Sequence, residues 1–352
     1  MTGLHVRLLS FDDDPPIGGQ GVVVLHLRKE LERQGVYTDT IASRGAYAHP
    51  YRKILHRAPL DFSIMVNQLG PQLWQGADLL HVQGGPGGVL LLRRPHIPVV
   101  YSANHTYSQA HGRTSFKRSL SPLEALAYRR AAQVIAISSS TADELLRMGI
   151  PARHVHLVHP GVERPVLKKP VERDPLRVIF VGRLEKEKGV MDALTAMIEL
   201  RHLVKGVSGV IVGDGARRAE VRSLARQNGI SVLGKVSRAR LLAEMASASV
   251  LLMPSHYEGL GLVALEAAAL GTVPVGYAVP GLTDALDGTG FAVTPFSPPA
   301  LISMAHSLLT EPQMWEEQSR KGREKVEMEY SWETSVRETV AVYRQALGQA
   351  SS

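Results

Sequence analysis

The chain alternates between short apolar runs and helical patterns, and a segment rich in proline and charge, 160–175, interrupts this alternation once. A short apolar run bounded by turn residues is typical of a buried strand. Apolar residues spaced by three and four indicate a helix with one buried face. Strand–helix alternation on both sides of a linker predicts two parallel sheets, each covered by helices on both faces. The expected fold class is therefore α/β.

The predicted elements form one series on each side of this linker. The length of 352 residues exceeds what a single core usually serves, which also favours two domains, 1–165 and 166–330. The first series has strands at 4–10, 36–42, 78–82, 98–102, 133–137 and 155–159 and helices at 22–34 and 142–148. The second has strands at 176–182, 208–213, 230–233, 248–253 and 273–276 and helices at 189–204, 216–227, 238–246, 261–270 and from about 298, with a break near Tyr330 and Ser331.

Composition and the N-terminus favour a cytoplasmic protein. The chain has no cysteine, which excludes disulfides and thiolate metal sites and fits a reducing compartment. The first apolar run is short and is followed by Asp12, Asp13 and Asp14, unlike a signal peptide. No apolar stretch approaches the roughly 20 residues that span a bilayer.

The net charge of +7 is concentrated in the first half of the chain. Residues 1–165 hold 18 Lys and Arg against 12 Asp and Glu, whereas 166–352 hold 22 against 21. This excess favours contact with an anionic surface or acceptor, such as a membrane face or a phosphorylated lipid. The alternative is a solvated basic surface. A nucleic-acid partner is not expected.

The segment 255–276, SHYEGLGLVALEAAALGTVPVG, carries the strongest chemical signal. Gly259, Leu260 and Gly261 open a helix directly after a strand. Glycine lets a ligand approach the backbone, and the free N–H groups of a first helical turn bind anions such as a diphosphate. Glu258 and Glu266 would repel phosphate, so they suit the hydroxyls of a sugar and a ribose. The alternative is a surface glutamate and a glutamate on the polar side of the helix.

A second segment, 178–190 (VIFVGRLEKEKGV), supplies positive charge after another strand. Arg183 and Lys188 are residue types that hold phosphates. Lys186 could exchange roles with Lys188. Taken alone, the segment could equally be a solvated turn.

Together, VGRLEKEKG and EGLGLVALE resemble the GT4-type retaining glycosyltransferases of the GT-B fold, the glycosyl transferases group 1. Further segments fall in the order expected for that family: PPIGGQG at 15–21, HVQGGPGG at 81–88, SANHTY at 102–107, IAISSSTADEL at 135–145, LVHPGV at 157–162 and YSWETSVRETVAVYRQAL at 330–347. The resemblance implies two Rossmann-like domains facing across a central cleft. It also implies an acceptor-binding first domain, a donor-binding second domain and a final helix, 331–350, that packs back on the first domain.

The resemblance further implies a role for each matching residue. Arg183 and Lys188 clamp the donor diphosphate with the amides near residue 260, while Glu258 and His105 contact the transferred sugar. The remaining donor contacts implied are Gly18 and Gly19 in the first glycine loop, Ser138 at phosphate or sugar, Gly213, Asp214, Gly215 and the backbone of Lys235 and Val236 around the base, Gly259, Leu260 and Gly261 at phosphate, and Glu266 at the ribose. For His105 the alternative is a structural hydrogen bond.

The implied reaction moves a sugar from a UDP- or GDP-linked donor to a glycan, lipid-linked or small-molecule acceptor. Arg183, Lys188 and a helix N-terminus stabilise the leaving diphosphate, which takes the acceptor's proton on the same face and so gives retention. No cofactor and no metal are expected, and the run at Asp12 is assigned to helix entry or acceptor-side charge. A phosphorylase, an epimerase or a nucleotide-sugar-binding subunit without turnover are the rival functions.

Overall fold

The structure, a computed structural model, describes residues 3–12, 19–42, 58–85, 88–110, 119–163, 166–167 and 170–350. Its contacts divide the chain into two compact units, Met1–Gly161 with Trp332–Ser352, and Val162–Ser331. We call these the first and the second unit. The sequence interpretation predicted the breaks at 165 and 330. Within the described ranges, no helix combines the length and apolar character that crossing a membrane requires.

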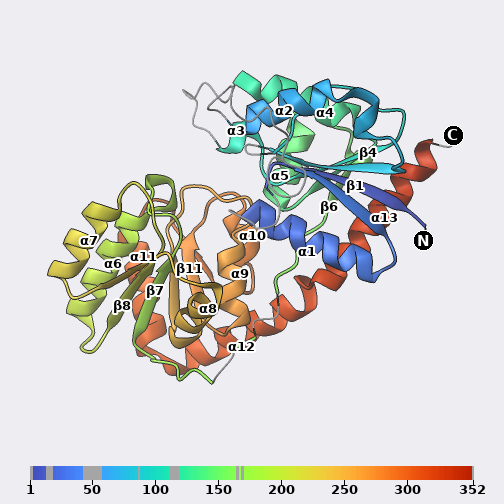
Figure 1. Cartoon of the computed structure of the whole chain (residues 1–352). Coiled ribbons are helices and arrows are strands. Elements are labelled where there is room, and N and C mark those ends of the chain that lie inside the picture. The colour runs from blue at the N-terminus through green and yellow to red at the C-terminus, as the bar shows by residue number, and fades with distance from the viewer. Residues whose placement is uncertain are drawn as a thin grey trace. The chain divides into compact units, whose positions relative to one another are not determined.

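The first unit is built on a six-stranded parallel sheet in the order β2-β1-β3-β4-β5-β6 (Figure 1). The strands are β1 (His5–Ser10), β2 (Tyr37–Ala42), β3 (Leu79–Gly84), β4 (Val99–Ala103), β5 (Gln133–Ala136) and β6 (Val155–Leu157). The helices are α1 (Gly19–Arg33), α2 (Ala58–Gln68), α3 (Tyr107–Ala110), α4 (Ser121–Arg130), α5 (Ser139–Arg147) and α13 (Trp332–Ala350). Every strand prediction in this half is confirmed to within two residues.

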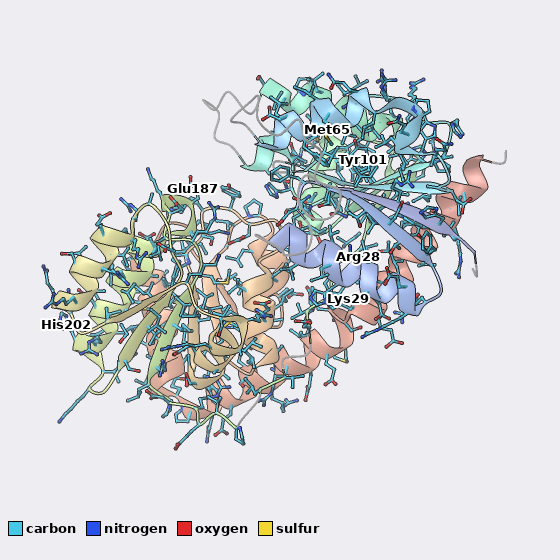
Figure 2. The ribbon with its side chains drawn as sticks, in the orientation of Figure 1. Arg28, Lys29, Met65, Tyr101, Glu187 and His202 are labelled. Carbon is cyan, nitrogen blue, oxygen red and sulfur yellow. The ribbon has the colours of Figure 1, made fainter. Side chains whose placement is uncertain are left out.

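Neighbouring residues on each strand point to opposite faces of this sheet, which gives the first unit two apolar cores. Leu8 packs with α1 and α13, whereas Leu9 packs with α2, α4 and α5. Tyr101 on β4 belongs to the second of these cores, and Figure 2 shows it in the interior of the first unit. The sheet is therefore covered on both faces, as the unbroken apolar runs of its central strands predict.

The last helix, α13, is fixed to the sheet of the first unit by a buried hydrogen-bonded histidine. His81 on β3 lies 2.6 Å from the hydroxyl of Tyr343 on α13 and 2.7 Å from that of Ser102 on β4. Burial lowers the pKa of His81 to about 3, so this imidazole is neutral. The first unit thus includes the C-terminal residues, although 262 positions separate His81 from Tyr343.

The second unit repeats the architecture around a parallel sheet in the order β12-β11-β10-β7-β8-β9. The strands are β7 (Arg177–Val181), β8 (Ser208–Val212), β9 (Ser231–Gly234), β10 (Val250–Met253), β11 (Val273–Tyr277) and β12 (Phe291–Val293). The helices are α6 (Val190–Leu203), α7 (Arg218–Gln227), α8 (Arg238–Ser247), α9 (Leu262–Ala269), α10 (Leu282–Leu286), α11 (Pro298–Thr310) and α12 (Pro312–Glu329).

The strand order of the second unit reverses between β7 and β10. From β7 the chain runs outward to β8 and β9, then returns to β10 on the other side of β7 and continues to β11 and β12. Since crossovers between parallel strands are right-handed, helices before and after the reversal cover opposite faces. In agreement, the crossover helices α6 and α9 lie in different layers: α9 packs with α12, whereas α6 packs with α11, which follows the last strand and returns to the α6 face. A ligand of such a sheet binds at the carboxyl ends of the strands flanking the reversal.

Candidate donor site

The loops that follow β7 and β10 meet at this reversal in the second unit. The backbone N–H of His256 donates to the carbonyl of Glu187 at 2.8 Å, and Figure 2 shows Glu187 in the loop between β7 and α6. Gly189 has a φ of 65°, and a Cβ there would lie 1.9 Å from the carbonyl oxygen of Pro254. Only glycine allows this approach, which brings the two predicted segments into direct contact.

Lys188 and Glu258 form an ion pair where these two loops touch. The Lys188 ammonium lies 2.6 Å from Oε1 of Glu258, and the hydroxyl of Ser255 donates to the same oxygen at 2.8 Å. Both charged side chains are largely buried, with 24% and 13% of their surface exposed. The structure therefore brings Lys188 to Glu258, whereas Lys186 is exposed on the same 3₁₀ turn, Lys186–Lys188.

The N-terminus of α9 opens next to this ion pair, as the glycines predict. Gly261 precedes the helix with a φ of 86°, and no side chain of the described residues caps it. The loop after β11 packs tightly against the turn at 258–261, because a Cβ on Gly281 would lie 2.2 Å from the carbonyl oxygen of Glu258. The turn at 258–261 is thus held on two sides while its first helical N–H groups lack a side-chain acceptor.

Glu266, one turn into α9, pairs with an arginine that the sequence interpretation missed. Nη2 of Arg238, the first residue of α8, lies 2.7 Å from Oε1 of Glu266. The Glu266 side chain is 17% exposed and that of Arg238 is 44% exposed. Arg238 begins the helix that follows β9, directly after the strand-end loop where a ligand contact was expected. No spacing in the sequence links it to Glu266.

The loop after β8 packs on the loop after β7. Gly213 has a φ of 141°, and a Cβ there would lie 1.8 Å from the carbonyl oxygen of Gly182. The Leu184 N–H donates to the carbonyl of Asp214 at 3.0 Å. The carboxylate of Asp214 accepts from the Gly215 N–H and from Arg218, so it is already engaged.

The residues predicted to frame the base therefore lie together at the ends of β8 and β9. Gly213 donates its N–H to the carbonyl of Gly234, which ends β9, at 3.0 Å. Val236 follows in the next turn and is half-buried. This loop cluster borders the segment that carries Arg183.

Arg183 is exposed in the loop after β7. Its positive charge acts on Tyr257, beside Glu258: burial raises the pKa of the Tyr257 hydroxyl, and Arg183 opposes that rise. The structure thus brings Arg183, Lys188, Glu258 and the N-terminus of α9 together at the carboxyl ends of β7 and β10.

In the first unit, His105 and Ser138 follow β4 and β5 at the same edge of the sheet. Ser138 is fully buried, and its hydroxyl accepts from the Thr141 N–H at 3.2 Å as the N-cap of α5. His105 is partly buried, and Gly19 is exposed at the start of α1. Gly18 lies outside the described residues. The ligand contacts of these residues stay predictions.

Asp12 is the one member of the Asp12–Asp14 run that falls within the described residues. It is buried directly after β1, and its carbonyl accepts a hydrogen bond from the hydroxyl of Ser10 at 2.6 Å. Within the described ranges, His, Asp and Glu side chains nowhere gather in groups of three that could hold a metal ion.

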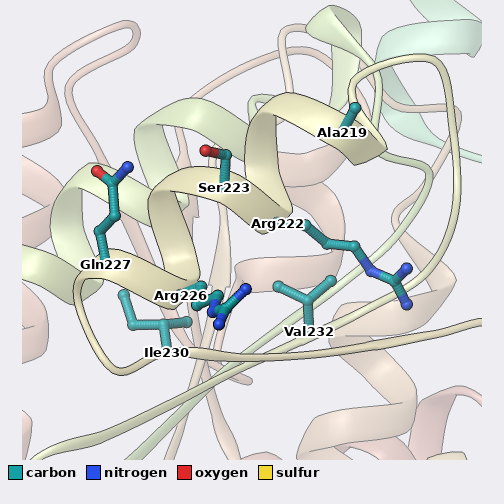
Figure 3. A pocket seen from close by; sticks show the side chains of 7 residues that line it. All are labelled: Ala219, Arg222, Ser223, Arg226, Gln227, Ile230 and Val232. Atoms are coloured by element: carbon teal, nitrogen blue, oxygen red, sulfur yellow. The ribbon is translucent and has the colours of Figure 1, made fainter.

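A separate open groove of the second unit runs between α7 and the edge strand β9 (Figure 3). Arg222 and Arg226 project from α7 toward the side of β9 that carries Val232. The lining residues are Ala219, Arg222, Ser223, Arg226, Gln227, Ile230 and Val232. The groove contains none of the residues predicted to bind the donor.

The two parallel sheets and the loops at the strand reversal place this chain in a class of two-sheet α/β proteins, and comparison with known proteins identifies the family. The family model Glycosyltransferase Family 4 matches residues 17–164, and Glycosyl transferases group 1 matches 164–325. A D-inositol 3-phosphate glycosyltransferase of Streptomyces avermitilis is 31% identical over 317 residues, covering 78% of this chain and 68% of that protein. This chain belongs to the GT4-type glycosyltransferases, and the resemblance inferred from its motifs is confirmed.

Other relatives and solved structures agree on the fold. A glycogen synthase of Mycobacterium tuberculosis is 29% identical over 260 residues, which span 70% of this chain and only 63% of that relative. Sucrose-phosphate synthase from Thermosynechococcus elongatus superposes with a TM-score of 0.79 at 21% identity, covering 98% of this chain and all of the other. Anabaena HepE in complex with UDP and glucose has a TM-score of 0.70 at 16% identity, with 97% and 99% covered. The GT-B fold class is therefore confirmed.

Proposed function

We propose that this protein is a retaining glycosyltransferase that moves a sugar from a nucleotide-diphosphate donor to an acceptor hydroxyl. The observation that carries the proposal is the contact between the loop of Lys188 and the turn 258–261 at the strand reversal of the second unit. That contact supplies an ammonium, a guanidinium and an uncapped helix N-terminus within one loop cluster. A diphosphate is the anion that matches such a cluster.

The proposed chemistry follows from the charges that develop as the anomeric C–O bond breaks. Negative charge builds on the diphosphate, where Arg183, Lys188 and the first turn of α9 stabilise it. Positive charge builds on the sugar, next to the carboxylate of Glu258. The leaving phosphate takes the proton of the acceptor hydroxyl as the new bond forms on the same face, so the anomeric configuration is retained.

Binding of the nucleoside falls, in this proposal, to the loops beside the cationic cluster. Glu266, held by Arg238, accepts hydrogen bonds from the ribose hydroxyls. The backbone of 213–215 and of Val236 borders the base. UDP- and GDP-linked sugars are the donors to test first, and the Anabaena structure in complex with UDP and glucose supports beginning with uridine.

The acceptor is proposed to bind to the first unit, with an anionic acceptor favoured. Residues 1–165 carry a net charge of +6, from 18 basic and 12 acidic residues. The Streptomyces relative is named for an acceptor that carries a phosphate. Phosphorylated polyols and lipid-linked phosphates are therefore the first acceptors to assay, since charge complementarity speeds encounter.

A thermal-shift screen of nucleoside diphosphates and their sugars tests the donor site. A ligand at a hundredfold excess over its Kd stabilises by about 2.7 kcal/mol, enough to rank donors. We expect the shift to disappear in Lys188→Ala and to persist in Lys186→Ala, the matched control on the same turn. Transfer is then followed with the best donor, and NMR of the product reads the anomeric configuration. Binding without hydrolysis or transfer would instead favour a nucleotide-sugar-binding subunit, and no binding would contradict the donor site itself.

A further inference from the structure

A buried carboxyl group in the first unit has no part in the chemistry proposed above. Glu124 on α4 has no exposed surface and lies close to Tyr101 on β4 and Tyr128 on α4. Burial raises the pKa of this carboxyl to about 7. An isolated buried carboxyl is costly, so the contacts that it makes need an explanation.

Glu124 contacts the segment that carries His105. Its Oε2 accepts the backbone N–H of Tyr107 at 2.9 Å, while Oε1 accepts the hydroxyl of Tyr128 at 3.1 Å. Tyr107 begins α3, two residues after His105, and an N–H at this position of a helix has no acceptor within the helix. The carboxyl therefore fixes the backbone immediately after the histidine.

Two other elements fix the same segment. Gly85, after β3, has a φ of 89°, and a Cβ there would lie 2.3 Å from the carbonyl oxygen of His105. Gln109 accepts the Thr106 N–H at 3.0 Å and donates to the carbonyl of Ser140 on α5 at 2.9 Å. The backbone around His105 is thus held by β3 before it and by α4 and α5 after it.

We propose that Glu124 is a positioning residue, whose carboxyl places His105 for its contact with the transferred sugar by fixing the Tyr107 amide. The inference rests on the proposed function for the role of His105 and on the hydrogen bonds of the first unit for the geometry. The second contact of the carboxyl, with Tyr128, offers a matched control. Tyr128→Phe removes one hydrogen bond of Glu124 and leaves the bond to the His105 segment intact.

Three variants separate positioning from packing. Glu124→Ala removes the acceptor, Glu124→Gln keeps an amide oxygen for the Tyr107 N–H, and Tyr128→Phe changes only the other partner. If alanine prevents folding, Glu124→Met replaces it, because methionine fills a similar volume without an acceptor. Hydrogen exchange of segment 104–110 is measured by mass spectrometry in each full-length variant, and transfer kinetics are measured in parallel.

We expect exchange of segment 104–110 to accelerate about tenfold in Glu124→Ala, since a lost hydrogen bond of this kind is worth about 1.4 kcal/mol. We expect kcat to fall about tenfold or more, because misplacing a contacting group slows the chemical step. The KM for donor should change less than twofold, since most of the proposed donor contacts, those to the diphosphate and the nucleoside, belong to the second unit. Glu124→Gln should restore both properties, and Tyr128→Phe should resemble the wild type in both.

Unchanged exchange in Glu124→Ala would overturn the proposal, and so would equal losses in Tyr128→Phe and Glu124→Ala. Faster exchange in Glu124→Ala with full turnover would show that Glu124 holds segment 104–110 without positioning His105. That result would also overturn the proposal. A wild-type protein that shows neither donor binding nor transfer would instead defeat the proposed function. That failure is read from the donor screen, independently of the exchange data.

Discussion

The ammonium of Lys188 lies 2.6 Å from the carboxylate of Glu258, although 70 positions separate them in the chain. The motifs assigned these residues to different parts of a donor, the diphosphate and the sugar. Their contact implies that a phosphate bound to Lys188 must compete with Glu258 for the same ammonium. Donor binding and sugar activation are therefore expected to be coupled through this pair.

Glu258→Gln should separate the two effects. Removing the negative charge frees Lys188 for phosphate, so we expect the Kd for nucleoside diphosphate to fall about three- to tenfold. Transfer should fall about a hundredfold, because the carboxylate no longer stabilises the developing positive charge on the sugar. Calorimetry and initial rates measure the two. Glu187→Gln, an exposed carboxylate on the neighbouring loop, serves as the control. Weaker nucleotide binding in Glu258→Gln would refute the competition.

Arg238→Ala should weaken donor binding only through Glu266. Arg238 fixes one oxygen of that carboxylate at 2.7 Å, so its loss should raise the donor KM about three- to tenfold. The same substitution in a Glu266→Ala background should have little further effect, which a double-mutant cycle tests. Arg240→Ala, which alters the neighbouring pair with Glu244, is the matched control. Additive effects in the cycle would mean that Arg238 acts on its own.

Gly189→Ala should destabilise the second unit by about 2–4 kcal/mol, because positive φ and backbone overlap combine there. Gly234→Ala separates these causes. Its φ is 70°, but the nearest atom to an added Cβ is a flexible arginine nitrogen at 3.9 Å. That substitution should cost only about 1 kcal/mol. Urea unfolding followed by hydrogen exchange of second-unit peptides measures the stability of both variants. Equal losses of stability would mean that the positive φ, and not the overlap with Pro254, accounts for the whole effect.

Transfer should persist after treatment with EDTA. In the proposed mechanism Arg183, Lys188 and the N-terminus of α9 supply the positive charge that a divalent cation supplies elsewhere. We expect initial rates in EDTA within about twofold of those with added Mg²⁺ or Mn²⁺, at saturating donor. A loss of activity that added metal restores would reassign part of this charge to an ion.

Glu124→Gln should change how stability depends on pH. The pKa of Glu124 is about 7 in the folded protein, against the ordinary glutamate value of about 4.5 when the chain is unfolded. The folded state therefore holds this proton more tightly, and wild-type stability falls as pH rises from 4.5 through 7. Relative to wild type, the glutamine variant should gain about 1–3 kcal/mol between pH 4 and pH 8. Urea titrations read on first-unit peptides measure this. Parallel pH curves would show that Glu124 is not the group responsible.

Much of the architecture was readable because strands and helices leave local periodicities. The strand predictions are confirmed in both units, as is the Ser138 cap of α5, since a serine before a helical run supplies its own acceptor. The helices α2 and α4 were not predicted. Proline at the start of α4 and Glu124 in its first turn were available signals. Beyond these signals, α2 and α4 owe their position to packing on the sheet.

The sequence by itself determined the α/β class, the two rounds of alternation and the segments that carry Lys188, Glu258 and Glu266, because each depends on neighbours along the chain. Only the tertiary structure decided that β10 pairs with β7, and hence that Lys188 meets Glu258 and Arg238 meets Glu266. Strand order is set by which apolar faces pack together and by the hand of the crossovers. Those are properties of the whole sheet that no local pattern records.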